Sequence, residues 1–199
     1  MAAAVVLDRL RRLGVVFRSR DAIAAGVSWR DLYRLRDDGV IVELSRGLFQ
    51  LAEAAGTGNV DFVAVCARVP HGMICLNSAL AYWDLSDEIP IEVHVAVPEG
   101  SHRPTIDYPP TKAHVFRAAT FSLGRIEVRE EHGERFWISD RERTVVDVFR
   151  MRHLIGEDMA NEALRRYLGD RPKPGRVADF ARALRVWTPL SSAMRVLSA

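Results

Sequence analysis

The chain has 199 residues, of which 48% are hydrophobic and 27% are charged, and its formal net charge is +2. This is the composition of a folded protein with one large or two small domains, and it excludes an intrinsically disordered chain. The apolar run near the start ends at Asp8, and no stretch reaches the roughly 18 apolar residues of a membrane span. We therefore expect a cytoplasmic protein without a signal peptide.

The charge of the chain changes near residue 52. Residues 1–52 hold nine Arg against six Asp or Glu, a net charge of +3, whereas residues 53–199 have a net charge of −1. The change coincides with EAAGTGN (Glu53–Asn59), a small, polar, glycine-bearing stretch that is typical of a linker. The sequence thus predicts a domain at 1–52, a linker at 53–60 and a second domain at 61–199.

The first domain is predicted to hold three short helices followed by a hairpin. The third helix follows from GVSWRDLYRLRDDG, where Ser28 is a good N-cap and Gly39 a good helix stop. At 100° per residue, Leu32 and Leu35 fall on the same side of this helix as Ser28. The opposite side carries polar and aromatic residues: Arg30, Tyr33, Arg34 and Asp37.

A short helix at Arg20–Ala24, ended by Ala25–Gly26, precedes this third helix, and two short helices joined by a glycine-containing turn predict a helix-turn-helix. VIVEL and GLFQL flank Ser45–Gly47 and predict the hairpin wing of a winged helix. The fold class predicted for the whole chain is α+β. A winged helix-turn-helix domain is followed by a mixed α/β domain with a helical C-terminal part.

A winged helix predicts DNA binding. The arginines of the third helix are expected to contact guanine edges or phosphates. Those at the start of the second helix are expected to contact phosphates, and the wing arginine is expected to reach the minor groove. The expected DNA-binding residues are Arg18, Arg20, Ser28, Trp29, Arg30, Tyr33, Arg34 and Arg46. The alternative is a winged helix used for protein contacts. It is favoured by three acidic residues that repel phosphates unless they are turned away, namely Asp31, Asp37 and Asp38.

The second domain is predicted to begin with helices at 60–69 and near 77–83, the latter N-capped by Asn77–Ser78. Short strands follow, of which IEVHVAV (Ile91–Val97) has the clearest alternation. From Ser139 onward the pattern is helical. The predicted helical segments are SDRERTVVDVFRMRHL, EDMANEALRRYL, RVADFARALRVW and a short helix after Pro189.

Three stretches of the chain resemble AbiEi-type antitoxins of type IV toxin–antitoxin systems. They are GVSWRDLYRLRDDGVIVELSRGLFQL, LNSALAYWDLSDEIPIEVHVAVPEG and ISDRERTVVDVFRMRHLIGEDMANEALRRYL. They stand in the family's order: a winged helix, a Leu-Ser-Asp-Glu-Ile-Pro-like turn before a strand, and an (S/D)-x-E-R-T-x-x-D-x-F helix. The residues that match the family motifs are Ser78, Asp84, Asp87, His94, Glu142, Arg143, Thr144, Asp147 and Phe149.

This resemblance implies a bifunctional regulator. The winged helix would bind operator DNA upstream of its own operon and repress it. The C-terminal part would neutralise a nucleotidyltransferase-like toxin encoded next to it. A monomer in solution or a dimer on DNA is compatible with the sequence.

The motif residues also have structural interpretations. Arg143 and Asp147 are four residues apart and predict a weak contact on one helix face. Ser139 or Asp140 is a plausible N-cap, and Asp84 and Asp87 beside Pro90 are typical turn residues. The expected core positions of this helix are Val145, Val146, Phe149 and Leu154.

We expect a binding protein rather than an enzyme, because the chain has no phosphate-cradling glycine loop and no metal-ligand spacing. No cofactor and no metal are predicted, and Cys66 and Cys75 are expected to be buried, reduced thiols. The alternative is an antitoxin that modifies its toxin, for example by phosphorylation with Mg²⁺ and ATP. Its candidate catalytic carboxylates are Asp84, Asp87, Glu92, Asp140 and Asp147.

A further alternative is a ligand-sensing transcription regulator, which needs an apolar pocket with a few convergent polar groups. The aromatic residues that would line such a pocket are Tyr82, Trp83, Phe116, Phe136 and Trp137.

Overall fold

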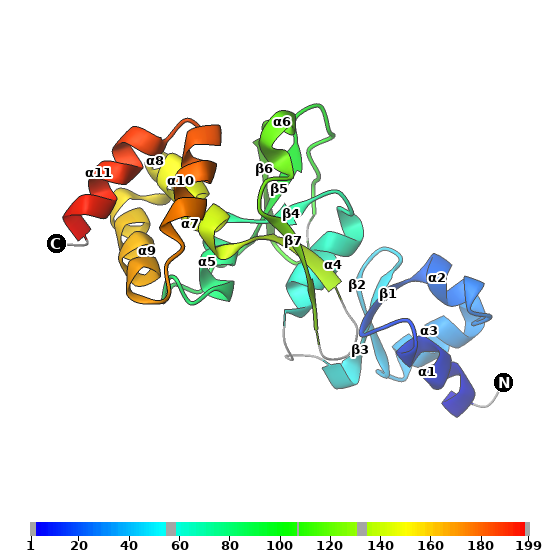
Figure 1. Cartoon of the computed structure of the whole chain (residues 1–199). Helices are drawn as coiled ribbons and strands as arrows, with labels where there is room; N and C mark the ends of the chain where they lie inside the picture. Colours follow the sequence, from blue (N-terminus) through cyan, green and yellow to red (C-terminus); the bar gives the residue numbers. More distant parts are fainter. Residues whose placement is uncertain (1–2, 55–58, 107, 131–134, 198–199) are drawn as a thin grey trace. The chain divides into compact units, whose positions relative to one another are not determined.

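The computed structural model of the chain describes residues 3–54, 59–106, 108–130 and 135–197. Two compact units are present, and Figure 1 traces both. The first spans Met1–Pro70 with Ile106–Pro110 and Val128–Phe136, and the second holds the rest of the chain. The first unit thus continues past residue 52, and residues 55–58 of the predicted linker lie outside the described residues. Over the described ranges, no helix is long and apolar enough to cross a membrane.

The first unit has the element order helix, strand, helix, helix, strand, strand, followed by one more helix (Figure 1). Its strands form an antiparallel sheet in the order β1-β3-β2. The three helices and the hairpin agree with the predicted elements, whereas β1 is too short to show an alternating pattern. The elements are α1 (Ala3–Arg11), β1 (Val16–Arg18), α2 (Ser19–Ala24), α3 (Trp29–Asp37), β2 (Ile41–Ser45), β3 (Leu48–Leu51), a 3₁₀ turn (Ala52–Ala54) and α4 (Val60–Arg68).

One apolar core holds the first unit together. Leu32 and Leu35 of α3 are buried, as the helical wheel predicts, and Phe17 of β1 stacks on Phe49 of β3 with ring centroids 6.1 Å apart. The other buried members come from α1, α2, β2, β3 and the segments before β1 and α3: Val6, Leu10, Val15, Ala22, Val27, Ile41 and Leu51. Because α2 and α3 are both short, they are stabilised mainly by packing and only secondarily by helix propensity.

The second unit contains most of a five-stranded sheet with the strand order β6-β5-β4-β8-β7. Strands β5 and β6 are parallel, β4 and β8 are parallel, and β4 and β5 are antiparallel. Helix α5 contacts β5, and α6 follows β6. The elements are β4 (Met73–Ile74), α5 (Leu76–Tyr82), β5 (Val93–Pro98), β6 (Thr111–Phe116), α6 (Ala118–Phe121), β7 (Arg125–Arg129) and β8 (Arg135–Ser139).

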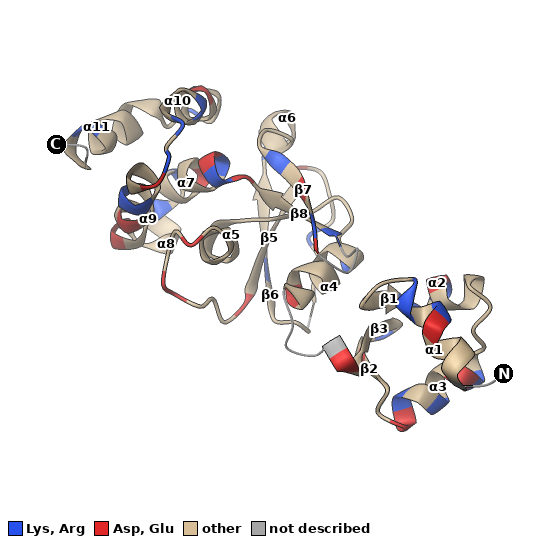
Figure 2. Ribbon diagram, turned by 60° about the horizontal axis from the view of Figure 1, so that its bottom comes forward, with Lys and Arg blue, Asp and Glu red and all other residues tan. Residues whose placement is uncertain are grey.

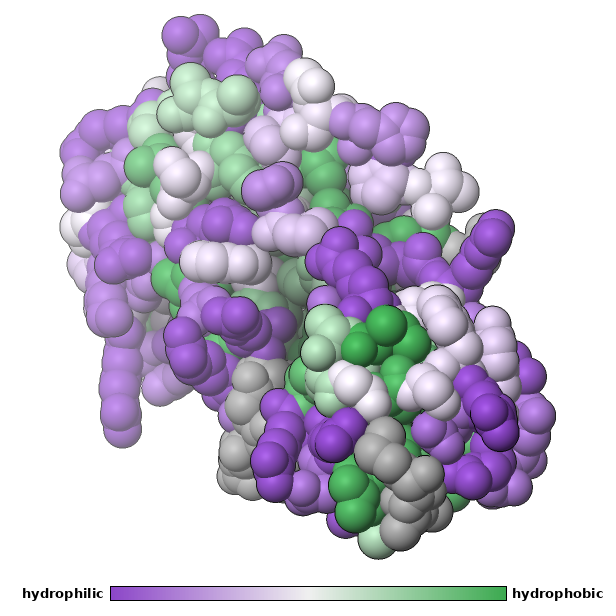
Figure 3. Space-filling model, turned by 90° about the vertical axis from the view of Figure 1, so that its right-hand side faces the viewer, coloured by the Kyte–Doolittle hydropathy of each residue, from purple (hydrophilic) through white to green (hydrophobic). Residues whose placement is uncertain are grey.

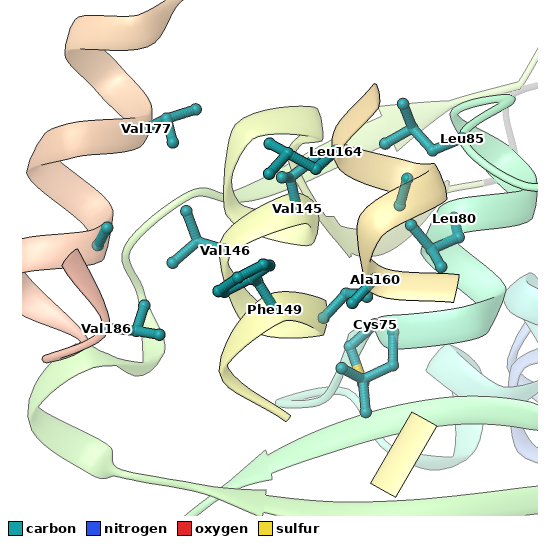
Figure 4. Packing of buried hydrophobic residues seen from close by; sticks show 14 of the residues in the cluster. Cys75, Leu80, Leu85, Val145, Val146, Phe149, Ala160, Leu164, Val177 and Val186 are labelled. Carbon is teal, nitrogen blue, oxygen red and sulfur yellow. The ribbon is translucent and has the colours of Figure 1, made fainter. Parts of the chain in front are cut away.

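The chain then continues as helices, and α7 lies at the centre of their core. Val145, Val146 and Phe149 of α7 pack against side chains of α5, α9 and α10 (Figure 4). Cys75 is part of this core, and both cysteines are buried and form no disulfide, as predicted. The helices are α7 (Arg141–Arg150), α8 (Arg152–Ile155), α9 (Glu157–Gly169), α10 (Pro174–Ala183) and α11 (Trp187–Leu197).

Two sequence predictions for this unit are wrong. The helix predicted from Ser139 to Leu154 is interrupted at Met151, so Leu154 falls on the short α8 and is 65% exposed instead of buried. Helix α5 is N-capped by Cys75, so Asn77 and Ser78 lie inside the helix. Ser78 was wrongly predicted as part of the N-cap because its hydroxyl has a different partner. It accepts a hydrogen bond from the backbone N–H of His94 at 2.8 Å.

Candidate functional site

Helix α3 begins with a reciprocal pair of hydrogen bonds. The Ser28 hydroxyl accepts from the Asp31 backbone N–H at 3.1 Å and donates to the Asp31 carboxylate at 2.7 Å. This hydrogen bond from Ser28 lowers the pKa of Asp31. The carboxylate is also 3.1 Å from Arg34, and Asp31 is only 8% exposed. The acidic group nearest the start of α3 is thus turned inward and neutralised, which is the orientation that phosphate binding requires.

The outer face of α3 is aromatic and basic. Trp29 and Tyr33 are about half exposed and stack with ring centroids 5.8 Å apart, and the Arg36 guanidinium lies 4.8 Å from the Tyr33 ring centre. Arg30 is exposed on the same helix. The acidic residues at the C-terminal end of α3 are visible in Figure 2, and Asp37 among them pairs with Arg36 at 2.9 Å.

The first unit also exposes several large apolar side chains. The large hydrophobic residues with substantial exposure on α1, α3 and β2 are Val5, Trp29, Tyr33 and Val42. On the side of the first unit that Figure 3 displays, hydrophobic residues alternate with hydrophilic ones. The aromatic side chains of α3, which lie beside arginines, suit both the sugar–phosphate backbone and thymine methyl groups.

The turn between α2 and α3 is held by the first helix. Gly26 has φ +79°, a left-handed conformation that favours glycine, and the Val27 N–H donates to the Ala22 carbonyl at 3.0 Å. Arg9 of α1 donates to the Gly26 carbonyl at 2.9 Å. A Cβ at position 26 would lie 2.8 Å from the Arg9 guanidinium. The angle between the two helices is therefore specified by this glycine and this arginine.

The hairpin β2–β3 is connected to both α2 and α3. At its tip, Gly47 has φ +72°, and its N–H donates to the Glu43 carboxylate at 3.1 Å. The Gly47 carbonyl accepts from the Ser19 N–H at the start of α2 at 3.0 Å. Glu43 also pairs with Arg36 of α3 at 3.4 Å. Arg46 next to Gly47 stays exposed, so the hairpin presents one arginine from a braced loop.

The two arginines predicted to contact phosphates before α2 differ. Arg18 is partly buried, donates to the Ala67 carbonyl of α4, and has a pKa lowered by burial. Arg20 has a side chain that is 73% exposed and lies 3.4 Å from Asp21.

Of the predicted DNA-binding residues, the structure places Trp29, Arg30, Tyr33 and Arg34 together on exposed α3, Arg46 on the hairpin and Arg20 on exposed α2. Arg18 and Ser28 have partners within the unit. Arg36 was not among the predicted residues, because its wheel position lies beside the apolar side; it is partly exposed, packs on the Tyr33 ring and pairs with Asp37 and Glu43.

In the second unit, Arg143 and Asp147 form a fully buried ion pair. The Arg143 Nε is 2.7 Å from the Asp147 carboxylate, and both side chains are 0% exposed. Arg143 also donates to the carbonyls of Thr120 and Leu123 at 2.9 and 2.6 Å, while Asp147 accepts from Arg150 at 2.9 Å. The predicted contact between these two residues is present, but the surrounding sheet and helices bury the pair completely, which helix spacing alone did not predict.

The start of α7 is a second buried polar cluster. Asp140 is its N-cap, accepts from the Arg143 backbone N–H at 2.7 Å and pairs with Arg176. Burial is the main effect on this carboxyl group and raises the pKa of Asp140. Glu142 accepts from the Tyr167 hydroxyl at 3.3 Å, and the Thr144 hydroxyl is 2.8 Å from that of Ser139. These contacts join α7, α9 and α10, so the motif residues Glu142, Arg143, Thr144 and Asp147 have structural partners.

Strands β5 and β6 bring two histidines together. The ring nitrogens of His94 and His114 are 3.2 Å apart, and Glu92 pairs with Lys112 at 3.3 Å. Burial lowers the pKa of both histidines, that of His114 to about 4. This pairing was not predicted, because the two residues are 20 positions apart and only the parallel register of β5 and β6 aligns them.

Four of the five carboxylates proposed for catalysis have separate cationic partners, and Asp84 is exposed without an ion pair to the described residues. Asp87 pairs with Arg166, Glu92 with Lys112, Asp140 with Arg176 and Asp147 with Arg143. Within the part of the chain that the structure describes, no group of three or more His, Cys, Asp or Glu residues is arranged to hold a metal ion.

A pocket of about 280 Å³ lies in the second unit where α5 and α9 end and α7 begins. Its lining residues are Tyr82, Trp83, Asp84, Arg141, Arg166 and Asp170. Of the five aromatic residues predicted to line a ligand pocket, Tyr82 and Trp83 do so. Phe116 and Phe136 are buried, and Trp137 lies under the Arg125 guanidinium at 3.8 Å.

Residues 5–52 match the family model described as "Transcriptional regulator, AbiEi antitoxin". The resemblance to AbiEi antitoxin regulators is thereby confirmed. The match covers the chain from α1 to β3 and includes every residue predicted to bind DNA. The motif residues from Ser78 onward lie outside the matched AbiEi segment, so their roles are inferred from their contacts alone.

Among solved structures, the chain is similar to the crystal structure of the RV2827C protein from Mycobacterium tuberculosis. The TM-score is 0.56 and the sequence identity 17%, and the alignment covers 98% of this chain and 80% of that one. At this identity the similarity shows the fold and nothing further. No curated protein matches the chain.

Proposed function

We propose that this protein is a DNA-binding antitoxin that represses its own operon, with the first unit acting as a winged helix-turn-helix. In this proposal α3 is the recognition helix and the β2–β3 hairpin is the wing. The observation that carries it is the face of α3, which exposes Trp29, Arg30, Tyr33 and Arg34 while Asp31 is buried. The AbiEi match over residues 5–52 supports the regulator role.

The contacts assign different tasks to the exposed arginines. Arg30 forms no hydrogen bond or ion pair with the described residues, so its guanidinium is available to a guanine edge. Arg34 is 3.1 Å from Asp31, which orients it and leaves its side chain 47% exposed. Arg46 on the hairpin is positioned for the minor groove, and Arg20 on α2 for a phosphate.

For the second unit we propose neutralisation of a nucleotidyltransferase-like toxin encoded next to this protein, in the cytoplasm. The family description of the first unit supports this role. Occlusion of the toxin by binding is the simpler mechanism, because four of the five candidate carboxylates of a modifying enzyme are engaged in separate ion pairs. We propose no cofactor for this activity.

The DNA-binding proposal is tested with the double variant Arg30→Ala/Arg34→Ala on DNA from upstream of the operon. The free energy of operator binding should become less favourable by about 1–3 kcal/mol for each lost base contact. Fluorescence anisotropy at several salt concentrations measures this. A loss that is equal on unrelated DNA and flattens the salt dependence would assign the residues to phosphates. Arg195→Ala, an exposed arginine of α11, is the matched control. Unchanged operator binding by the double variant would contradict the proposed recognition helix.

The antitoxin proposal is tested with the full chain and the neighbouring toxin. We expect the double variant that has lost operator binding to co-elute with the toxin and still protect cells from it. Intact mass of the toxin, with and without Mg²⁺ and ATP, separates binding from modification. A gain of one phosphoryl group only when ATP is present would replace occlusion by an enzymatic mechanism. Loss of protection in the double variant, with co-elution retained, would show that repression is the main protective effect.

A further inference from the structure

The pocket of the second unit combines two aromatic side chains with one carboxylate that has no partner. The rings of Tyr82 and Trp83 stand at 83° to each other with centroids 4.8 Å apart. The Trp83 indole N–H donates to the Ser139 carbonyl at 2.8 Å, which fixes the ring. The neighbouring Asp84 is exposed, and its carboxylate has no hydrogen bond or ion pair with the residues that the structure describes.

The two arginines of the pocket are already neutralised. Arg166 binds Asp87 through both terminal nitrogens and Glu162 through Nε, the last at 2.8 Å. Arg141 donates to the Asp170 carbonyl at 2.6 Å and pairs with the Asp170 carboxylate at 2.9 Å. An anionic ligand would have to displace these carboxylates. The charge that remains available in the pocket is therefore the negative charge of Asp84.

The C-terminal ends of α5 and α9 at the pocket add to this negative potential, whereas the N-terminus of α7 partly opposes it. Helix α9 has 13 residues and ends at its C-cap Asp170, which lines the pocket, and α5 ends at Trp83. The carbonyl groups at a helix C-terminus carry partial negative charge and favour cations. Aromatic faces and a carboxylate around a small cavity are the groups that bind guanidinium and ammonium ions.

The loop that leaves the pocket indicates what kind of molecule carries the cation. Ile89 and Ile91 are 90% and 94% exposed, and they follow Asp87, the residue that pairs with the pocket residue Arg166. The Ser86 hydroxyl accepts from the Glu88 N–H at 3.1 Å and further fixes the loop. Two nearly fully exposed isoleucines on a fixed loop are typical of a surface that a protein partner covers.

We infer that the pocket takes an arginine or lysine side chain of a protein partner, whose neighbouring apolar residues contact Ile89 and Ile91. An arginine seated in a pocket and flanked by apolar contacts is a frequent centre of protein–protein interfaces. This inference goes beyond the proposed function, because it names a binding chemistry for the second unit that is independent of DNA binding.

The test follows the Trp83 indole N–H by NMR during titration with acetyl-Gly-Arg-Gly-amide. The matched probe is the same peptide with citrulline, which keeps the shape of arginine and lacks its charge. We expect the arginine peptide to shift the Trp83 signal and to bind at least about tenfold more tightly than the citrulline peptide. Equal affinity of the two peptides, or a response to Mg·ATP and none to either peptide, would overturn the inference.

Two variants separate the carboxylate from the rest of the fold. Asp84 has φ +54°, and asparagine tolerates this conformation as well as aspartate does, so Asp84→Asn removes the charge without straining the backbone. We expect Asp84→Asn to weaken the binding of the arginine peptide about fivefold or more. Asp158→Asn, an exposed carboxylate on the first turn of α9, should leave the affinity unchanged. An equal effect of the two variants would show that only net charge matters and would contradict the site.

The apolar part is tested with acetyl-Leu-Arg-Leu-amide. This peptide should bind more tightly than the glycine-flanked one to the wild-type protein, and the advantage should disappear in Ile89→Ser/Ile91→Ser. The glycine-flanked peptide should bind this variant and the wild type equally. Persistence of the leucine advantage in the variant would exclude the loop from the interface. None of these measurements involves DNA. The pocket inference can therefore fail while the proposed regulator function holds, and the regulator function can fail while the pocket inference holds.

Discussion

Helices α3 and α7 carry the same kind of charged pair and use it differently. In α3, Arg34 and Asp31 are one turn apart, with side chains 47% and 12% exposed. In α7, Arg143 and Asp147 are one turn apart and both 0% exposed. The first pair lies at a protein surface and orients an arginine toward solvent. The second connects α7 to the backbone of α6 and the turn after it. The spacing of an ion pair along a helix therefore does not reveal its role, because its burial decides how strongly the two charges depend on each other.

The largest expected effect comes from breaking the buried pair. Asp147→Ala leaves the Arg143 guanidinium buried without its carboxylate, and the free energy of unfolding should fall by about 3–5 kcal/mol. Urea denaturation followed by circular dichroism measures this. In Arg143→Met/Asp147→Leu, which removes both charges, part of the stability should return. A loss below about 1 kcal/mol in Asp147→Ala would show that the pair resembles the surface pair of α3.

A smaller effect is expected where the backbone approaches Arg143. Gly124 has φ +62°, and a Cβ there would lie 2.7 Å from the Arg143 Cβ and 3.0 Å from the Asp140 carboxylate. Gly124→Ala should therefore cost about 1–3 kcal/mol in excess of its backbone strain. Gly100→Ala is the matched control, since its φ is +86° and nothing lies within 4 Å of the added Cβ. Equal losses of thermal stability in the two variants would mean that the side chains around Arg143 move to accommodate the added Cβ at little energetic cost.

Acid should reveal a third, intermediate effect in the second unit. Burial lowers the pKa of His114 from 6.5 to about 4, with further lowering by His94, Lys112 and Arg103, while Glu92 opposes it. Between these values the unfolded chain binds more protons than the folded one, so stability rises with pH and is lost as pH falls from about 6.5 to about 4. His114→Gln should flatten this part of the denaturation profile, and the exposed His71→Gln should not. A profile that His114→Gln leaves unchanged would contradict the burial effect.

The smallest effect is expected at the N-cap of α3. Ser28→Ala removes the hydroxyl that exchanges hydrogen bonds with Asp31 and should cost about 1 kcal/mol of stability. Ser28→Gly should cost only a few tenths of a kcal/mol, since glycine is an acceptable N-cap. Thermal denaturation compares the two. A loss as large as that of Asp147→Ala would mean that α3 depends on polar contacts as strongly as α7 does.

The sequence by itself determined the local features of this protein. The N-cap at Ser28, the stop at Gly39 and the apolar side of α3 follow from rules that act over one or two helical turns, and the AbiEi resemblance rested on the same contiguous stretches. The N-cap at Asp140 and the core positions Val145, Val146 and Phe149 were local in the same sense.

Only the tertiary structure decided the features that join distant segments. The complete burial of Arg143 and Asp147 depends on the elements packed around α7, and the contact of His94 with His114 depends on the register of two parallel strands. The pocket likewise combines residues of α5, α7 and α9 that are far apart in the chain. The physical reason is that helix periodicity and capping depend on neighbours in sequence, whereas burial and charge pairing across elements depend on neighbours in space.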